Sequence, residues 1–334
     1  MIRRICLFIF FICLLPGRIG RAQQDAPIRL VQTIPLPNVH GRIDHFDVDM
    51  KGERLFMSAL DNDTLEVFDI RSNRLIYEIG GLEEPQGVTY AAKSNRIFVA
   101  NGDDGTIRMF DGRSYKLLKS VHVSSDADDS RYDSATNEVV VGYGDKANAG
   151  LAVLDGTTGD LVRNISLPAH PESFQLEEIG KKIYVNIPTA NNIVDVVDRS
   201  TGKIVATWTL GANRDNFPMA LDETNHRLFI VTRMPAEGLI LDTESGSIIA
   251  RFTSVTRADD AWYDAANKRA YISGGGGFVT VIEQMDANHY RGMAQVKTAD
   301  GARTSCLAPQ LNRFYLGVWG QGGQPEELRI YAIR

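Results

Sequence analysis

The sequence repeats one two-strand pattern seven times, and this repeat restricts the chain to very few folds. Each copy contains an apolar run, a polar loop and a second run of alternating polarity. An aromatic or β-branched residue lies at the centre of each first run: Phe56, Phe98, Val140, Tyr184, Phe229, Tyr271 and Tyr315. The second runs occupy residues 65–69, 107–111, 151–155, 194–198, 238–242, 279–283 and 328–331.

The spacing of the copies identifies the kind of repeat. Successive central residues are 42, 42, 44, 45, 42 and 44 positions apart. A period of about 40 to 45 residues, with four short strands in each unit, is typical of β-propeller blades. Alternation with a period of two, rather than 3.6, excludes a helical solenoid. The sequence therefore predicts an all-β, seven-bladed propeller with four-stranded antiparallel blades.

The last repeat ends at Arg334 directly after its third strand, so it lacks a fourth. Residues 28–37 resemble the fourth strands of other repeats, such as 203–210. We expect this segment to pair with the last blade, because closing the ring in this way removes exposed strand edges. Residues 23–334 then form a single domain. Turns after the third strands begin with aspartates that bind their own turn backbone: Asp69, Asp111, Asp155, Asp198 and Asp242.

Residues 1–22 have the pattern of a secretory signal peptide: arginines, an apolar run at residues 5–15, and small residues around a cleavage point. The run is too short to span a membrane. Because Arg18 and Arg21 follow it, an uncleaved anchor is the alternative. We expect an exported protein, periplasmic or secreted, with no transmembrane segment after signal removal, and a monomer.

Charge and cysteine content limit the partners and the redox chemistry. Removing residues 1–22 takes away four arginines and no acid, which moves the net charge from −6 to about −10. This charge argues against a nucleic-acid partner. Cys306 is the one cysteine outside the signal segment, and we expect it to be a buried apolar residue rather than a reactive thiol.

Two repeats contain Phe98-Val99-Ala100-Asn101 and Tyr184-Val185-Asn186. With these motifs, nearly the whole mature chain resembles the YVTN-repeat, YncE-like bacterial β-propellers. The resemblance implies the seven-bladed fold. It implies no single activity, because that family includes proteins of unknown role, adhesion-type and surface-layer repeats, and relatives of the haem d1 domain of nitrite reductases.

Functional residues are expected where the loops between blades meet around the channel. The residue 12 positions before each central residue lies where an innermost strand begins. We call these the seven ring positions: Asp44, Gln86, Asp128, Glu172, Phe217, Asp259 and Arg303. Four of them are acidic, and His45, Asp129 and Asp260 directly follow three of the four. The sequence therefore predicts an acidic channel mouth.

This mouth is predicted to bind a small-molecule or protein ligand. The expected ligand-binding residues are Asp44, His45, Asp128, Asp129, Glu172, Asn216, Asp259, Asp260 and Arg303. The candidates for acid–base catalysis are His45, Glu172 and Asp260. We expect the remaining histidines to lie in turns or at the rim, in solvated or structural roles: His40, His122, His170, His226 and His289.

Carboxylates that converge in a narrow mouth repel one another, so either some stay protonated or a cation lies among them. Oxygen ligands suit a hard ion such as Ca²⁺, with Asp128, Glu172 and Asp259 as its candidate ligands. The cofactor is otherwise unknown. Arg303 is the one cation among the ring positions. It either clamps a ligand carboxylate or phosphate, or forms a salt bridge to Asp44 or Asp259.

Three functions remain open at this stage. The leading one is an exported propeller that binds a ligand or a protein partner at its acidic mouth without catalysis. The alternative is a divalent-metal-dependent hydrolase of lactonase type at the same site. The second alternative is a haem d1-related cofactor protein with His45 as axial ligand, which a second histidine at the mouth would favour.

Overall fold

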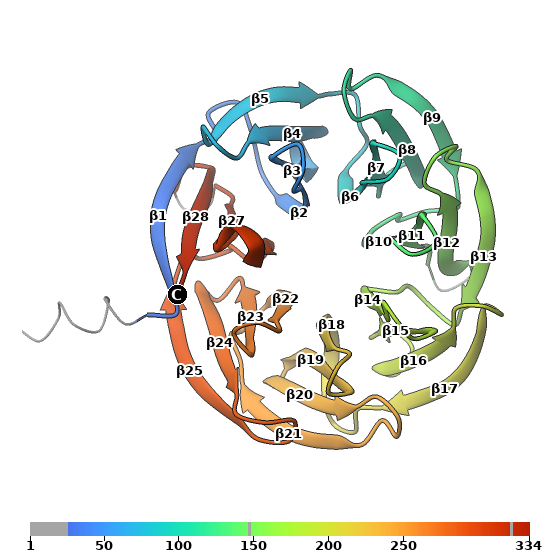
Figure 1. The fold of residues 1–334 in the computed structure, drawn as a ribbon, viewed down its shortest axis with the longest axis vertical. Coiled ribbons are helices and arrows are strands. Elements are labelled where there is room, and N and C mark those ends of the chain that lie inside the picture. Colours follow the sequence, from blue (N-terminus) through green and yellow to red (C-terminus); the bar gives the residue numbers. More distant parts are fainter. Residues whose placement is uncertain (1–25, 146–147, 321–322) are drawn as a thin grey trace, which may run out of the picture.

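The computed structural model describes residues 26–334, except residues 146–147 and 321–322. Seven four-stranded antiparallel sheets stand around a central axis like the blades of a propeller (Figure 1). The fold prediction is therefore confirmed in class and in blade number. The signal-peptide prediction for residues 1–22 lies outside the described residues. Within the described part of the chain, no helix has the length and apolar character needed to cross a membrane.

Each blade runs from an innermost strand beside the axis to an outermost strand at the rim (Figure 1). Blade 1 consists of β2 (Ile43–Asp49), β3 (Arg54–Ala59), β4 (Thr64–Asp69) and β5 (Arg74–Ile79). Blade 2 consists of β6 (Pro85–Ala91), β7 (Arg96–Asn101), β8 (Thr106–Asp111) and β9 (Leu117–His122). Blade 3 consists of β10 (Ser130–Asp133), β11 (Glu138–Tyr143), β12 (Ala149–Asp155) and β13 (Leu161–Leu167). Blade 4 consists of β14 (Ser173–Leu176), β15 (Lys182–Ile187), β16 (Ile193–Asp198) and β17 (Lys203–Thr209). Blade 5 consists of β18 (Arg214–Asp222), β19 (Arg227–Met234), β20 (Ala236–Asp242) and β21 (Ile248–Thr253). Blade 6 consists of β22 (Ala258–Asp264), β23 (Arg269–Gly274), β24 (Phe278–Gln284) and β25 (Tyr290–Lys297). Blade 7 consists of β26 (Ser305–Ala308), β27 (Arg313–Val318), β28 (Glu327–Ile333) and the N-terminal strand β1 (Ile28–Pro35). Two short 3₁₀ turns, η1 (Leu60–Asn62) and η2 (Pro309–Leu311), complete the elements.

The apolar core is divided among the gaps between blades. Buried side chains form seven clusters, and each cluster joins two neighbouring blades. Neighbouring residues of one strand serve opposite gaps: Phe56 of β3 packs toward blade 2, whereas Leu55 and Met57 pack toward blade 7. This explains why the second strands are apolar throughout, since both of their faces are covered.

The N-terminal strand closes the ring as predicted. Strand β1 pairs antiparallel with β28, with Ile28 opposite Ile333 and Pro35 opposite Glu327. It ends two residues before the predicted limit of residue 37. The turn aspartates also behave as expected: Asp155, for example, accepts hydrogen bonds from the backbone N–H groups of Thr157 and Thr158, both at 2.8 Å. Cys306 is buried and free, and packs between blades 7 and 1.

The closing strand is expected to stabilise the ring through its one fully buried side chain. Ile28 is 0% exposed, whereas Leu30 of the same strand is 44% exposed. Ile28→Ala should lower the free energy of unfolding by about 2 to 5 kcal/mol, because it leaves a cavity between blades 6 and 7. Leu30→Ala should change it by less than about 0.5 kcal/mol. Denaturant unfolding of both variants measures the difference, and equal losses would show that burial of Ile28 does not stabilise the closure.

Candidate functional site

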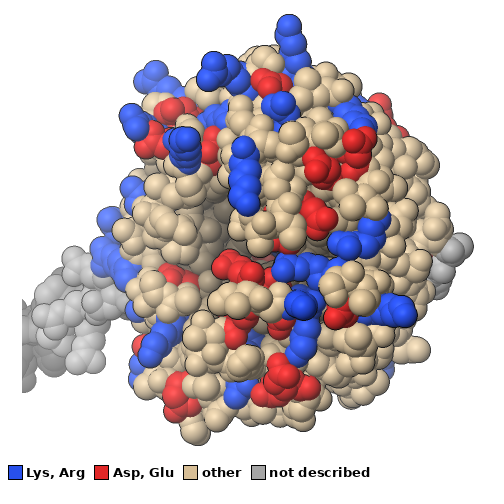
Figure 2. All heavy atoms as spheres, turned by 45° about the vertical axis from the view of Figure 1, so that its right-hand side comes forward, with Lys and Arg blue, Asp and Glu red and all other residues tan. Residues whose placement is uncertain are grey.

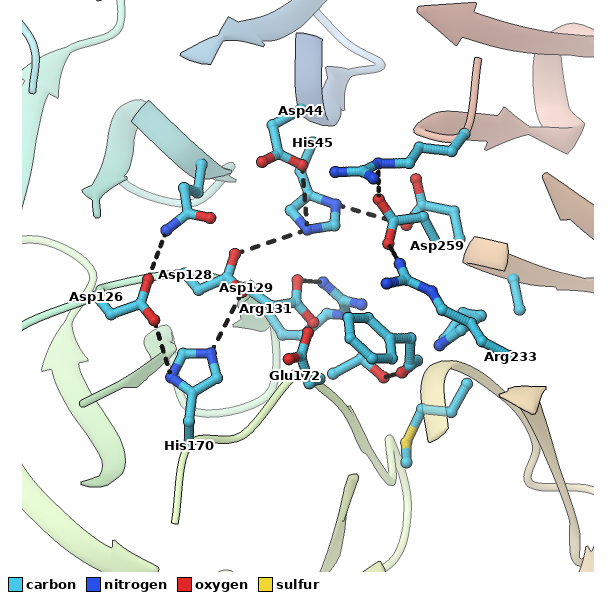
Figure 3. Close-up of a pocket in the computed structure, with 18 of the residues that line it drawn as sticks. Asp44, His45, Asp126, Asp128, Asp129, Arg131, His170, Glu172, Arg233 and Asp259 are labelled. Carbon is cyan, nitrogen blue, oxygen red and sulfur yellow. Dashed lines mark hydrogen bonds and ion pairs between the residues drawn. The ribbon is translucent and has the colours of Figure 1, made fainter. Parts of the chain in front are cut away.

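A cavity of about 350 Å³ lies at one mouth of the channel, where side chains from all seven blades meet (Figure 3). All seven ring positions line it, as do the predicted residues His45, Asp129 and Asp260. Figure 2 shows a hollow near the middle of the face in view, in which acidic and basic atoms lie side by side. The repeat frame therefore identified correctly which loop residues the fold brings together.

β-Bulges lie at the ring positions of four blades and turn the side chains there toward the channel. Successive residues of a regular strand point to opposite faces, so Asp44 and His45 could not both line one cavity in a regular strand. The pairing of β2 with β3 shifts register between Ile43 and Phe46. Strands β6, β18 and β22 shift register at their own ring positions. A bulge of this kind bends the strand and redirects side chains, and it is common beside binding and active sites.

Asn216 is the one predicted ligand-binding residue that does not line the cavity. It is fully buried, and its amide nitrogen donates to Asn186 Oδ1 at 2.9 Å and to the Ile193 carbonyl at 3.0 Å. The register shift in β18 lies between Asn216 and Met219, so the two residues within it, Phe217 and Pro218, face the cavity instead.

The mouth is less acidic than the sequence predicted. Three arginines that are not at ring positions reach the cavity beside Arg303, so four guanidinium groups face the carboxylates: those of Arg42, Arg131, Arg233 and Arg303. The carboxylic residues of the lining number seven: Asp44, Asp126, Asp128, Asp129, Glu172, Asp259 and Asp260. Much of the negative charge is therefore compensated by the protein itself.

His45 lies among three carboxylates near the channel axis (Figure 3). Its Nδ1 is 3.5 Å from Asp260 Oδ1, and its Nε2 is 3.8 Å from Asp44 Oδ1 and 3.9 Å from Asp128 Oδ1. Burial disfavours the charged imidazole, but the charges of Asp44 and Asp260 outweigh burial and raise the pKa of His45 well above its ordinary value. The surrounding carboxylates therefore favour the charged imidazolium form of this side chain.

His170 also lines the cavity, so its expected place in a solvated turn or at the rim is wrong. Its Nδ1 lies 2.6 Å from the Gly144 carbonyl and 3.5 Å from Asp126 Oδ2, and its Nε2 lies 3.6 Å from Asp128 Oδ2. Burial disfavours the charged ring, yet the hydrogen bond and charge of Asp128 and the charge of Asp126 raise the pKa of His170 to about 9. The sequence analysis missed His170 because this residue is not itself a ring position but stands two residues before Glu172.

Each guanidinium of the lining is paired with an aspartate. Arg42 Nη2 donates to Asp44 Oδ2 at 2.7 Å, and Arg131 forms a short ion pair with the buried Asp129. On the other side of the cavity, Asp259 is shared by two arginines. Arg233 binds its Oδ1, and Arg303 Nε lies 2.7 Å from its Oδ2.

Arg303 therefore forms one of the two salt bridges weighed from the sequence, the one to Asp259 in the neighbouring blade. Asp44 pairs with Arg42 instead. Arg303 Nε is buried and its N–H is not aligned for a hydrogen bond with the carboxylate, so the contact is an ion pair only. Asp259 carries one negative charge and is shared by Arg233 and Arg303, so one of the two guanidinium charges is left uncompensated.

Glu172 differs from every other acid of the described lining, because its side chain makes no hydrogen bond or ion pair. Burial, together with the charges of Asp128 and Asp259, raises the pKa of Glu172 to about 8, against the opposing charges of His170 and Arg233. It is therefore mostly protonated at pH 7. This is one of the two outcomes expected for converging carboxylates, namely that one of them keeps its proton.

Except for Glu172, the proposed metal and haem ligands already have protein partners. Among the described residues, no group of three or more His, Cys, Asp or Glu side chains is arranged to hold a metal ion. Of the Ca²⁺ candidates, Asp128 lies against His170 and Asp259 against two arginines, which leaves Glu172 alone. Binding of Ca²⁺ stays a prediction. Haem ligation does not fit, because both ring nitrogens of His45 and of His170 face protein oxygen atoms.

The two histidines are coupled through Asp128, which faces both of them. Asp128→Asn should lower the pKa of His170 by about one pH unit or more, because it removes the charge that opposes burial. NMR titration of the imidazole resonances measures this directly, since the chain has six histidines. Asp126→Asn should have a smaller effect, because the Asp126 side chain is 52% exposed. An unchanged His170 titration in Asp128→Asn would contradict this account of the charge balance.

Comparison with known proteins supports the architecture. No protein-family model matches this sequence, and no curated protein matches it. A chain in the crystal structure of the mitotic checkpoint complex is similar in structure, with a TM-score of 0.77 and 11% sequence identity over 99% of both chains. At this identity the similarity shows a shared seven-bladed propeller fold and nothing about the ligand.

Proposed function

We propose that this protein is an exported, monomeric β-propeller, periplasmic or secreted, that binds a small polar ligand at the mouth of its channel. One observation carries the proposal: all seven ring positions line one cavity, and they differ from blade to blade. Positions that repeat in frame but differ in chemistry are suited to an asymmetric ligand. The proposal of export rests on the signal-like pattern of residues 1–22.

The cavity favours a small molecule over a protein partner. Its volume of about 350 Å³ falls within the range of about 300 to 1,000 Å³ that is common for small-molecule sites. The charged groups lie deep in the mouth, with Asp44 and Asp129 only 1% exposed and Asp260 6% exposed. A flat protein surface could not reach them, whereas a small polar molecule that enters the mouth could.

Blocking the cavity tests this proposal. Glu172→Trp fills the mouth without breaking an ion pair, and Glu178→Trp places the same side chain at an exposed position beyond the other end of β14. The purified chain is screened by thermal shift against a mixed panel of small organic acids, amines and sugars. We expect some members to raise the melting temperature by several degrees, and Glu172→Trp to weaken their binding at least about tenfold.

Glu178→Trp should bind like the wild type. The proposal fails if no member of the panel binds, or if Glu172→Trp binds as well as the control. Isothermal titration of the best ligands with all three proteins separates a loss of binding from a change in stability.

A hydrolase of lactonase type is the second candidate, because His45 and Glu172 place two titratable groups beside the cavity. With both groups protonated at neutral pH, they are suited to act as acids rather than as bases. Neither of them is therefore poised to take a proton from water near pH 7, and Asp260, the third candidate, already accepts a hydrogen bond from the Ser305 backbone N–H at 2.6 Å and faces His45. Bound Ca²⁺, held by Asp128, Glu172 and Asp259, would supply that chemistry. Because the described part of the site offers acids but lacks a matching base, we rank ligand binding above hydrolysis.

A panel of lactones and esters, assayed with and without added Ca²⁺, tests the hydrolase candidate. If the site is hydrolytic, His45→Gln should lower turnover by about 10² to 10⁴-fold, the usual contribution of a general acid or base. His289→Gln is the matched control, because His289 is 77% exposed and pairs with Asp286 far from the ring positions. Absence of turnover by the wild type in both conditions would eliminate this candidate.

A further inference from the structure

The cavity has two walls of opposite charge. Arg233, Asp259 and Arg303 form a group of two cations and one anion, which we call the arginine wall. Figure 3 shows Arg233 beside Asp259. Next to this wall, His45 and His170 lie among four carboxylates, which we call the acidic wall: those of Asp44, Asp126, Asp128 and Asp260. Even with both imidazoles protonated and Arg42 paired to Asp44, this second wall has one more carboxylate than cations.

The arginine wall has unused hydrogen-bond donors. Arg233 donates Nε–H to the Ala258 carbonyl at 2.9 Å and one Nη to Asp259, which leaves Nη1 without a partner in the described structure. Arg303 makes its ion pair through Nε, so neither of its Nη groups has a partner among the described residues. Two guanidinium groups that line one cavity therefore present free N–H donors to it.

The wall is held in place before any ligand binds. The Arg233 guanidinium lies 3.4 Å above the centroid of the Phe217 ring, and its Nε–H and one Nη fix its plane. Arg233 and Arg303 side chains are each 22% exposed, and Asp259 is 12% exposed. Burial, and the charge of Arg303 beside it, lower the pKa of Arg233, which indicates that the two guanidinium groups repel each other. A largely buried excess charge of this kind is costly without a partner.

We propose that the arginine wall binds the carboxylate of a small organic acid, whose remaining polar end donates hydrogen bonds, through hydroxyl or ammonium groups, to the acidic wall. A carboxylate has the planar geometry that guanidinium groups bind through paired N–H donors. It also supplies the negative charge that the two arginines lack. This inference rests on the proposed function, since it names the ligand class of the same cavity.

Glu172 links the two walls and makes binding depend on pH. The charged groups that face it are Asp128, His170, Asp259 and Arg233. While it is protonated, Glu172 adds no negative charge beside the arginine wall and can donate its O–H to a ligand oxygen. Because its pKa is raised to about 8, ionisation at higher pH places a carboxylate against the bound one, and His170 loses its own proton at about 9.

The test uses acids beside their uncharged analogues. Lactate, gluconate, glycine and glutamate, the α-amides of lactate and glycine, and inorganic phosphate are titrated calorimetrically into the mature chain at pH 6.5. We expect at least one carboxylate to bind and its amide to bind at least about tenfold more weakly. The hydroxy acids and amino acids distinguish the two kinds of polar end, and phosphate tests whether any oxyanion suffices.

Arg303→Lys keeps the charge beside Asp259 but removes the planar pair of donors, so it should weaken the carboxylate about tenfold with little change in melting temperature. Arg291→Lys is the matched control on the rim, where Arg291 is 64% exposed and pairs with Glu283. Between pH 7 and 9.5 the wild-type affinity should fall about tenfold, and in Glu172→Gln the fall should be smaller, because the carboxyl group whose pKa is about 8 is absent.

The outcomes separate this inference from the proposed function. If amines, sugars or amides bind the cavity as well as the acids do, or if Arg303→Lys leaves carboxylate affinity unchanged, the carboxylate assignment is wrong while the binding function stands. If nothing in the panel or in the wider screen binds, both are wrong. Preference for phosphate over every carboxylate would overturn the ligand class but not the arginine wall as an anion site.

Discussion

The structure depends on the apolar contact between neighbouring blades. No blade has a core of its own, because both faces of its middle strands are covered by the next blade on either side. A blade is therefore stable only as part of a closed ring, and the pairing of β1 with β28 supplies the last edge. Since apolar packing occupies the gaps between blades, the channel mouth needs no apolar residues and is free to hold charges.

Charges that meet in the mouth must be compensated there, and the protein does this with its own groups. Four arginines and two imidazolium groups face seven carboxylic residues, and Glu172 keeps its proton. A bound cation is not needed to prevent repulsion among the carboxylates. The raised pKa values of His45 and His170 belong to the same balance, because each ring is buried beside acids that favour its charged form.

The ring and its ring positions could be predicted from the sequence because the repeat fixes a frame. The steps of 42 to 45 residues identify propeller blades, the seven copies give their number, and counting 12 positions back from each central residue finds the whole ring. The same frame also marks lining residues that are not at ring positions. Three further lining residues, Arg42, Asp126 and His170, stand two positions before Asp44, Asp128 and Glu172.

Other features of the site could not be predicted in this way. Arg233 reaches the cavity from the end of β19, a second strand that is longer than those of the other blades, and no repeat position marks it. Arg131 follows its ring position by three, where other blades have Asp47, Thr89 or Cys306. Phe217 and Pro218 face the cavity in place of Asn216 because of a bulge in β18, and the composition of the sequence does not reveal this bulge. Which charges pair is likewise a result of geometry alone.

The charge balance itself restricts what can bind. A ligand group that meets an existing ion pair, such as Arg131 with Asp129, must compete with a partner already in place, and separating buried charges is costly. A ligand group that meets an unpartnered donor or acid has no such competitor. Among the described lining residues, the proposed carboxylate meets such groups in the free guanidinium nitrogens of Arg233 and Arg303 and in the neutral carboxyl of Glu172. Under the proposed function, these three side chains provide the affinity for the ligand, whereas most of the charged residues around them hold one another in place.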